Sequence, residues 1–285
     1  VNCTDDFAQQ PQVINGGSNV QYGEGQVTGR HLLVGGEAAG NHYFTVRAVR
    51  KAVRFLKTMN APRYEGSYWA IIHPDCSYDI QDDPDWKRPH EYKDTSNIYD
   101  DEIGKIAGVR FIETTEAKVF HADDLTEGAR DLTVKSASSK VLTVNEAITT
   151  ADAAKLAGRE VVIGGALLEI ESATAAGAGS ATITLKEAPA ATPTASTTIY
   201  PGEAGAKGRN VYSTLIMGAE AYGTTELTGG GLEHIVKPLG SAGTADPLNQ
   251  RATVGWKATK VAERLVEAYM IRVETTSTFD ETPLT

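Results

Sequence analysis

This sequence of 285 residues has few cysteines and contains no long apolar run. The two cysteines, Cys3 and Cys76, form no CxxC pair and define no disulfide framework, so a reducing compartment is the simplest interpretation. No apolar run approaches the roughly 18 residues that a membrane-spanning helix needs. The start of the chain shows no signal-peptide pattern, and its first residue, Val1, leaves open whether residues precede it. The composition therefore predicts no membrane partner.

Basic residues are also in short supply, with 27 Lys and Arg against 37 Asp and Glu, which gives a net charge of −10. Proteins that coat nucleic acid draw their affinity from Lys and Arg at phosphates, so this balance argues against that class. The glycines among the first 43 residues form neither a G-x-G-x-x-G pattern nor a Walker loop. No cofactor is therefore predicted. Hydrophobic residues make up 41% of the chain, which predicts a packed core.

The chain is organised around residues 44–120, which open with an amphipathic helix. Apolar residues at three- and four-residue spacing predict this helix over 45–59, with Thr45 as its N-cap. Asn60 followed by Pro62 predicts its end. Basic residues fill its polar face: Arg47, Arg50, Lys51, Arg54 and Lys57.

Two strands and an acidic segment follow this helix. The aromatic and β-branched run 66–75 predicts a buried strand, and residues 101–115 predict a tight turn and a second strand. Between them, 75–102 is predicted to be an acidic loop with a short helix at 75–81 that Pro84 breaks. Its acids are Asp75, Asp79, Asp82, Asp83, Asp85, Glu91, Asp94, Asp100, Asp101 and Glu102.

The composition changes sharply over 122–204, where Ala, Thr, Ser and Gly dominate. Short runs between turn signals predict a small β-barrel or sandwich, inserted between flanks that belong together, with a helical turn at 148–158. The runs are 131–136, 140–145, 159–165, 166–172, 181–187 and 196–202.

The two ends of the chain are less regular. Residues 1–43 are expected to be a loop-rich lead-in that lies across a neighbouring surface, with a short strand at 31–34. After residue 204, an apolar stretch at 211–217, a turn at 246–248 and a helical turn at 260–268 are expected. Strands are predicted at 235–236, 252–261 and 268–275, and the last two are expected to pair antiparallel.

Catalysis has weak support in the sequence. His73 and Asp75 follow a predicted strand, where α/β enzymes often keep catalytic groups, so a hydrolase is one alternative. No G-x-S-x-G elbow accompanies them, and Cys76 has no sequence-evident base beyond His73. A local backbone partner for His73 explains its position more simply. No catalytic residue is assigned.

The acidic segment offers oxygen ligands for a hard cation. Asp82, Asp83, Asp85, His90 and Glu91 are the candidates, but the EF-hand pattern is missing. A solvated loop is the better interpretation. Neither cysteine lies at zinc-ligand spacing from a histidine, so no metal residue is assigned.

The basic helix face has three possible roles. It could contact DNA, be solvated, or pair with the acidic segment of a neighbouring copy in a ring. Charge complementarity of the last kind sets register and specificity more than affinity. Its test is the dependence of assembly on ionic strength.

Several long phrases resemble one family. The runs RAVRKAVRFLKTMNAPRYEGSYWAIIHPDCSYDIQDDPDW, NIYDDEIGKIAGVRFIETTEAKVF, NVYSTLIMGAEAYG and ADPLNQRATVGWKATKVAERLVEAYMIRVE are similar to Enquatrovirus-type major capsid proteins of tailed phages. The resemblance covers roughly 41–120 and 208–276. It implies an α+β Hong Kong 97 phage capsid fold, with the helix–strand unit in the axial domain and the C-terminal strands in the peripheral domain.

The resemblance also implies an organisation and a role. Such proteins carry an N-terminal arm and a long spine helix, which we expect this chain to lack because only 44 residues precede Thr45. The implied role is a structural, non-enzymatic shell protein of a double-stranded DNA phage, assembled in the host bacterial cytoplasm into hexamers and pentamers. Portal, scaffold or decoration proteins are implied partners. The packaged DNA is implied to be enclosed without sequence-specific binding. The expected parts are a lead-in (1–44), capsid core (45–121), inserted β domain (122–204) and capsid core (205–285).

One rival remains from a different class of particle. An encapsulin-like nanocompartment would share the fold, but no cargo-binding residues are evident in the sequence. The inserted β domain is expected on the outer surface of the shell, where it could bind decoration proteins or host surfaces.

Overall fold

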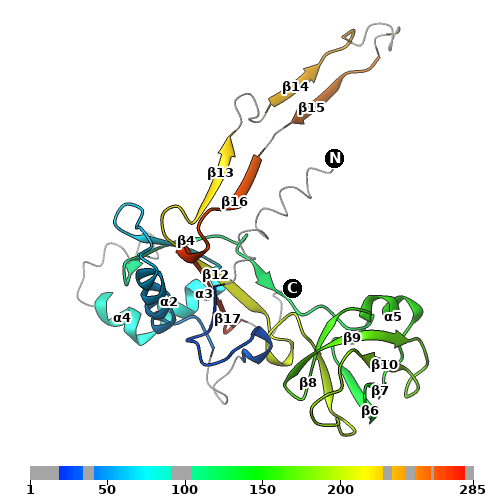
Figure 1. The fold of residues 1–285 in the computed structure, drawn as a ribbon. Coiled ribbons are helices and arrows are strands. Elements are labelled where there is room, and N and C mark those ends of the chain that lie inside the picture. The colour runs from blue at the N-terminus through cyan, green and yellow to red at the C-terminus, as the bar shows by residue number, and fades with distance from the viewer. Residues whose placement is uncertain are drawn as a thin grey trace.

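The structure is a computed structural model that describes residues 19–34, 42–90, 104–226, 233–241, 248, 250–257 and 260–279. Figure 1 shows a sheet with helices, a barrel of strands to one side, and a long two-stranded arm that extends away from both. Helix and strand occur together throughout, as expected of an α+β capsid fold.

The central sheet joins strands from distant parts of the chain. Along the sheet the order is β1 (Val20–Tyr22), β17 (Met270–Thr275), β12 (Val211–Met217), β2 (Tyr68–Ile72), β4 (Val109–Glu113) and β3 (Lys105–Ile106). The short strand β5 (Val119–Phe120) also pairs with β12. The β1–β17 and β2–β4 pairs are parallel, and the others are antiparallel. All seven residues of β12 are buried, which makes it the centre of this sheet.

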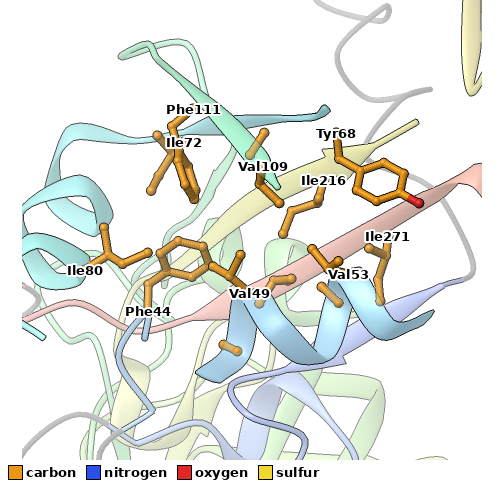
Figure 2. Close-up of a cluster of buried hydrophobic side chains, with 14 of the residues drawn as sticks. Phe44, Val49, Val53, Tyr68, Ile72, Ile80, Val109, Phe111, Ile216 and Ile271 are labelled. Atoms are coloured by element: carbon orange, nitrogen blue, oxygen red, sulfur yellow. The ribbon is translucent and has the colours of Figure 1, made fainter. Parts of the chain in front are cut away.

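Helix α2 (Val46–Thr58) covers one face of the sheet, as the apolar spacing predicts. Thr45 caps it, because its hydroxyl oxygen accepts a hydrogen bond from the Ala48 N–H at 3.2 Å. Figure 2 shows Val49 and Val53 pointing toward Ile216 and Ile271 of the strands. Each side chain of this size contributes roughly 1.5–3 kcal/mol when fully buried, so the stripe accounts for most of the helix's attachment.

The acidic segment is helical rather than a loop as far as residue 90. Helix α3 (Pro74–Asp82) confirms the short helix, and α4 (Pro84–His90) was not expected. Pro84 ends one helix and begins the next, because a proline at the first helical position loses no hydrogen bond. The acids at 91–102 lie outside the described residues.

Residues 132–201 form a closed barrel, one of the two arrangements left open by the sequence. Its order is β10 (Thr182–Leu185), β7 (Val141–Val144), β6 (Leu132–Ser138), β11 (Thr198–Pro201), β8 (Glu160–Ile163) and β9 (Ala166–Thr174). All six predicted strands are confirmed, and α5 (Thr150–Leu156) confirms the helical turn. The barrel has its own apolar core, with fully buried side chains that include Leu132, Leu142, Ile170 and Ile183.

A capping box at the start of α5 makes the barrel sensitive to acid. The Asp152 carboxylate accepts hydrogen bonds from the Thr149 hydroxyl at 2.7 Å and from the Glu127 N–H at 3.0 Å. These bonds hold the pKa of Asp152 below its ordinary value. A lowered folded pKa stabilises the fold above the unfolded pKa, and that stabilisation is lost as pH falls through the folded pKa.

Asp152→Asn is therefore expected to reduce the loss of stability between pH 5 and pH 2, although it lowers stability at neutral pH. Melting temperatures measured by circular dichroism across that range test this expectation. Glu171→Gln, at an exposed position on β9, is the control and should follow the wild type. An Asp152→Asn profile parallel to the wild type would refute the assignment.

A buried carboxylate fixes the lead-in to the central sheet. Glu274 of β17 is fully buried, and Arg30 donates to its two oxygens at 2.7 and 2.8 Å. Arg272 forms a second ion pair with it at 2.7 Å. The Arg30 guanidinium also stacks over Phe120, 3.4 Å from the ring centroid. This cluster ties the start, middle and end of the chain together.

Three expectations for the chain ends are wrong. The strand expected at 31–34 is replaced by a 3₁₀ turn, η1 (Arg30–Leu32), and the short strand there is β1. The helical turn expected at 260–268 is instead β16 (Lys260–Arg264), followed by a 3₁₀ turn, η6 (Glu267–Tyr269). The last two predicted strands do not pair, since β15 (Thr253–Lys257) pairs with β14 (Glu233–Lys237) and β17 pairs with β12.

Other parts of the end regions have different outcomes. The described lead-in, 19–34, packs on the chain's own central sheet, because β1 pairs with β17. One further 3₁₀ turn, η4 (Ala206–Gly208), precedes β12. Of the turn expected at 246–248, residues 246 and 247 lie outside the described part. No helix within the described ranges is long and apolar enough to cross a membrane.

Candidate assembly interface

The arm consists of two antiparallel ladders in succession. At its base β13 (Tyr222–Glu226) pairs with β16, and further out β14 pairs with β15. Each ladder is a separate two-stranded sheet, and Figure 1 shows the arm extending well beyond the helices and the barrel. Every residue of β14 and β15 is exposed.

The outer ladder of the arm has one apolar face. Directly opposite residues lie on the same face of an antiparallel pair, and residues two apart on one strand share that face. Val236 opposes Val254, and His234 opposes Trp256, so these four side chains lie together. Val254 is 69% exposed and Trp256 is 48% exposed. The opposite face carries the Glu233–Lys257 ion pair at 2.7 Å, together with Lys237, Thr253 and one apolar side chain, Ile235.

Such a ribbon needs support from another molecule. A single two-stranded hairpin is at best marginally stable in water, and exposed apolar patches mark interaction sites. The alternation of Val254 and Trp256 with polar residues predicts a strand, and β15 confirms it. The apolar face was missed, because the sequence did not show that β14 is its partner. A signal for that partner was the short β-branched run Ile235 and Val236, which the sequence also predicts as a strand.

Helix α2 presents the basic face that the sequence predicts. All five cations are exposed. Arg47 forms an ion pair with Glu24 at 3.4 Å, and Lys51 donates to the Glu24 carbonyl at 2.9 Å. An open groove of about 550 Å³ beside the end of the helix is lined by Arg50, Val53, Arg54, Lys57, Thr58 and Ala107.

The described acids of the acidic segment are largely engaged within the chain. Asp83 accepts a hydrogen bond from the Val46 N–H at 2.9 Å, and so caps α2. Asp79 accepts from the Thr278 hydroxyl at 2.6 Å, and burial raises the pKa of Asp79 while this bond opposes the rise. Asp82 pairs with Lys87. Asp79 and Asp83 therefore stabilise the fold, whereas the Asp82 and Lys87 side chains are 75% and 53% exposed. The expected loop is wrong for this part because the chain is helical there, although Asp82 is solvated as expected.

The candidate catalytic residues are placed in structural roles. His73 caps α3, since its Nδ1 accepts from the Asp75 N–H at 3.3 Å, and its ring packs 5.1 Å from that of Tyr212. Asp75 lies 3.4 Å from the same nitrogen. Cys76 is fully buried, with its sulfur 3.7 Å from the Thr275 hydroxyl. The simpler explanation of His73, a local backbone partner, is therefore found.

Three of the candidate cation ligands, Asp82, Asp83 and Asp85, lie within the described residues and form no metal site there. Asp83 directs its oxygens to backbone N–H groups of Val46 and Asp85, at 2.9 and 2.8 Å. Within the described ranges, no three His, Cys, Asp or Glu side chains are grouped so as to hold a metal ion. Glu91 lies outside those ranges, and of the His90 side chain the structure describes nothing.

Comparison with known families gives the class. The sequence model of a family described as phage capsid protein matches residues 12–226, which is most of the chain. The chain belongs to this phage capsid protein family. It is thus a structural, non-enzymatic protein of the virion.

A solved structure described as the capsid of the cyanophage P-SCSP1u aligns with a TM-score of 0.40 and 12% identity. The alignment covers 82% of this chain and 46% of that one, so this chain spans about half the length of that capsid protein. No curated protein matches the sequence.

Proposed function

We propose that this chain is the major capsid protein of a tailed double-stranded DNA bacteriophage and builds its icosahedral head. The observation that carries the proposal is family membership over residues 12–226. The arm supports it, because an apolar ribbon with every outer side chain exposed is suited to contacts between copies. The phrases that resemble Enquatrovirus-type capsid proteins, with a Hong Kong 97 fold, support the finer assignment.

The proposed parts follow the boundaries expected from the sequence. The capsid core is 45–121 together with 205–285, and 122–204 is an inserted β-rich domain, preceded by a lead-in at 1–44. Strand β5 pairs with β12 through Val211 and Phe120, so the chain leaves and rejoins the central sheet at neighbouring points. The barrel's separate apolar core also supports an insertion.

Hexamers and pentamers of this chain are the proposed building units, formed in the cytoplasm of the host bacterium. Portal, scaffold or decoration proteins are further proposed partners. DNA is enclosed without sequence-specific contacts, which agrees with a net charge of −10.

The barrel is proposed to lie on the outer surface of the shell. Deleting 123–203 and joining the ends with a short linker is expected to leave a folded core, because β5 and β12 already hold the junction together. Electron microscopy is expected to show particles that lack surface protrusions. An unfolded core, seen by circular dichroism, would show instead that the barrel is integral.

The contents of the particle test the proposed role. We expect the expressed full-length gene product, in its infected host, to form shells that protect DNA from nuclease. Shells loaded with protein would support an encapsulin-like nanocompartment instead. Monomers with hydrolase turnover would overturn both.

A further inference from the structure

The groove beside α2 contains cations that have no counter-charge among the described residues. Its charged lining comes from Arg50, Arg54 and Lys57. In the part of the chain that the structure describes, none of the three forms an ion pair, unlike Arg47 on the same face. The helix itself, Val46 to Thr58, contains no acidic residue.

The spacing of these cations makes the groove electrostatically unfavourable when empty. Arg50 and Arg54 lie four apart on the helix, and Lys57 follows three later, so like charges face each other along one row. The five cations of this face contribute +5 to a chain of net charge −10, so the rest of the chain carries a net charge of −15. A second copy therefore brings an excess of acids, whereas DNA is repelled by the chain as a whole.

The acids of segment 75–102 fall into two groups. Of the ten acids in 75–102, the five up to residue 90 have partners inside the chain, as Asp79, Asp82 and Asp83 illustrate. The other five follow α4 in sequence: Glu91, Asp94, Asp100, Asp101 and Glu102. With Lys93, segment 91–102 has a net charge of −4.

We propose that the groove at Arg50, Arg54 and Lys57 binds the acidic segment 91–102 of a second copy of the chain. The proposal rests on the proposed shell function. Arginine forks match carboxylates in two parallel hydrogen bonds and stack on aromatic rings. The segment interleaves its carboxylates with Tyr92 and Tyr99, which suits a groove whose lining also includes Val53. Such pairing would set the register between neighbours.

Two charge reversals test the pairing. The groove variant is Arg50→Glu, Arg54→Glu and Lys57→Glu, and the segment variant is Asp94→Lys, Asp100→Lys and Asp101→Lys. Each is expected to lower the yield of closed particles at least about tenfold. The control reverses three exposed lysines of the barrel with the same change of charge as the groove variant: Lys135→Glu, Lys140→Glu and Lys155→Glu. It should assemble like the wild type.

Mixing the two variants tests whether the contact joins different copies. In the mixture, the acidic groove of the groove variant can bind the basic segment of the segment variant. The unchanged basic groove of the segment variant can likewise bind the unchanged acidic segment of the groove variant, so the mixture is expected to recover particles. A groove variant that assembles as well as the wild type would overturn the proposal. So would recovery only when both reversals are on one chain, which would place the segment in its own groove. Normal particles with less DNA would assign the groove to nucleic acid instead.

A peptide titration separates this proposal from the shell function. A synthetic peptide of residues 91–102 is titrated into the soluble full-length gene product, the groove variant and the barrel control, each confirmed as folded by circular dichroism. Binding at least about tenfold weaker to the groove variant than to the other two supports the proposal, even if the wild type forms no particles. Equal binding to all three, or tighter binding of a single-stranded oligonucleotide of net charge −4, overturns it.

Discussion

Adding two charges to the apolar face of the arm is expected to abolish assembly and to leave the folded chain intact. In the variant Val254→Lys with Trp256→Lys, two side chains that are already exposed become charged. Each would otherwise contribute roughly 1.5–3 kcal/mol when buried against a neighbour. Since about 1.4 kcal/mol is a tenfold change, each contact should weaken by at least about 10². Sedimentation of the assembly reaction measures the loss.

The opposite face of the arm supplies a matched control. Thr253 and Gly255 lie on the opposite side of the same strand, so Thr253→Lys with Gly255→Lys adds the same charge to β15 without removing an apolar side chain. We expect this control to assemble, and both variants to melt within about 2 °C of the wild type, as exposed substitutions do. Equal assembly by the two variants would show that the apolar face makes no contact.

Replacing Glu274 by alanine is expected to lower the free energy of unfolding by about 3–5 kcal/mol. In the folded chain the side chains of Arg30 and Arg272 are 24% and 12% exposed. The substitution removes the carboxylate that these two arginines share. Removing one member of a buried ion pair costs this much because the remaining charge is uncompensated. Urea unfolding measures the change as a lower midpoint at constant slope.

A surface ion pair provides the comparison for Glu274. Glu169 pairs with Lys186 on the barrel, where the side chains are 40% and 51% exposed. Glu169→Ala should cost no more than about 1 kcal/mol, because exposed ion pairs contribute little. If both substitutions shift the midpoint equally, the Arg30–Glu274–Arg272 cluster does not stabilise the sheet as described.

Local patterns predicted the elements that depend on near neighbours. Helix α2 followed from apolar spacing, and the strands of the barrel followed from short runs between turn residues. The residues that predict each of these elements lie within about ten positions of one another. The capping role of His73 was also accessible, because its partner is two residues away.

Elements fixed by distant partners were not predictable in the same way. Strand β1 is only three residues long, and it exists because β17, about 250 residues later, offers a free edge. The run 260–264 has helical spacing at Val261 and Leu265, but pairing with β13 overrides it. The basic face of α2 was predicted in full, whereas the acids were misread because Asp83 and Asp79 serve as hydrogen-bond acceptors for distant backbone and hydroxyl groups.

A cryo-electron microscopy reconstruction of particles from the full-length gene product is the most direct test that the arm joins copies of this chain in a shell. We expect an icosahedral shell in which a neighbouring copy covers Val236, Val254 and Trp256 of the arm. Particles in which that face stays in solvent, or a product that remains monomeric at high concentration, would contradict it.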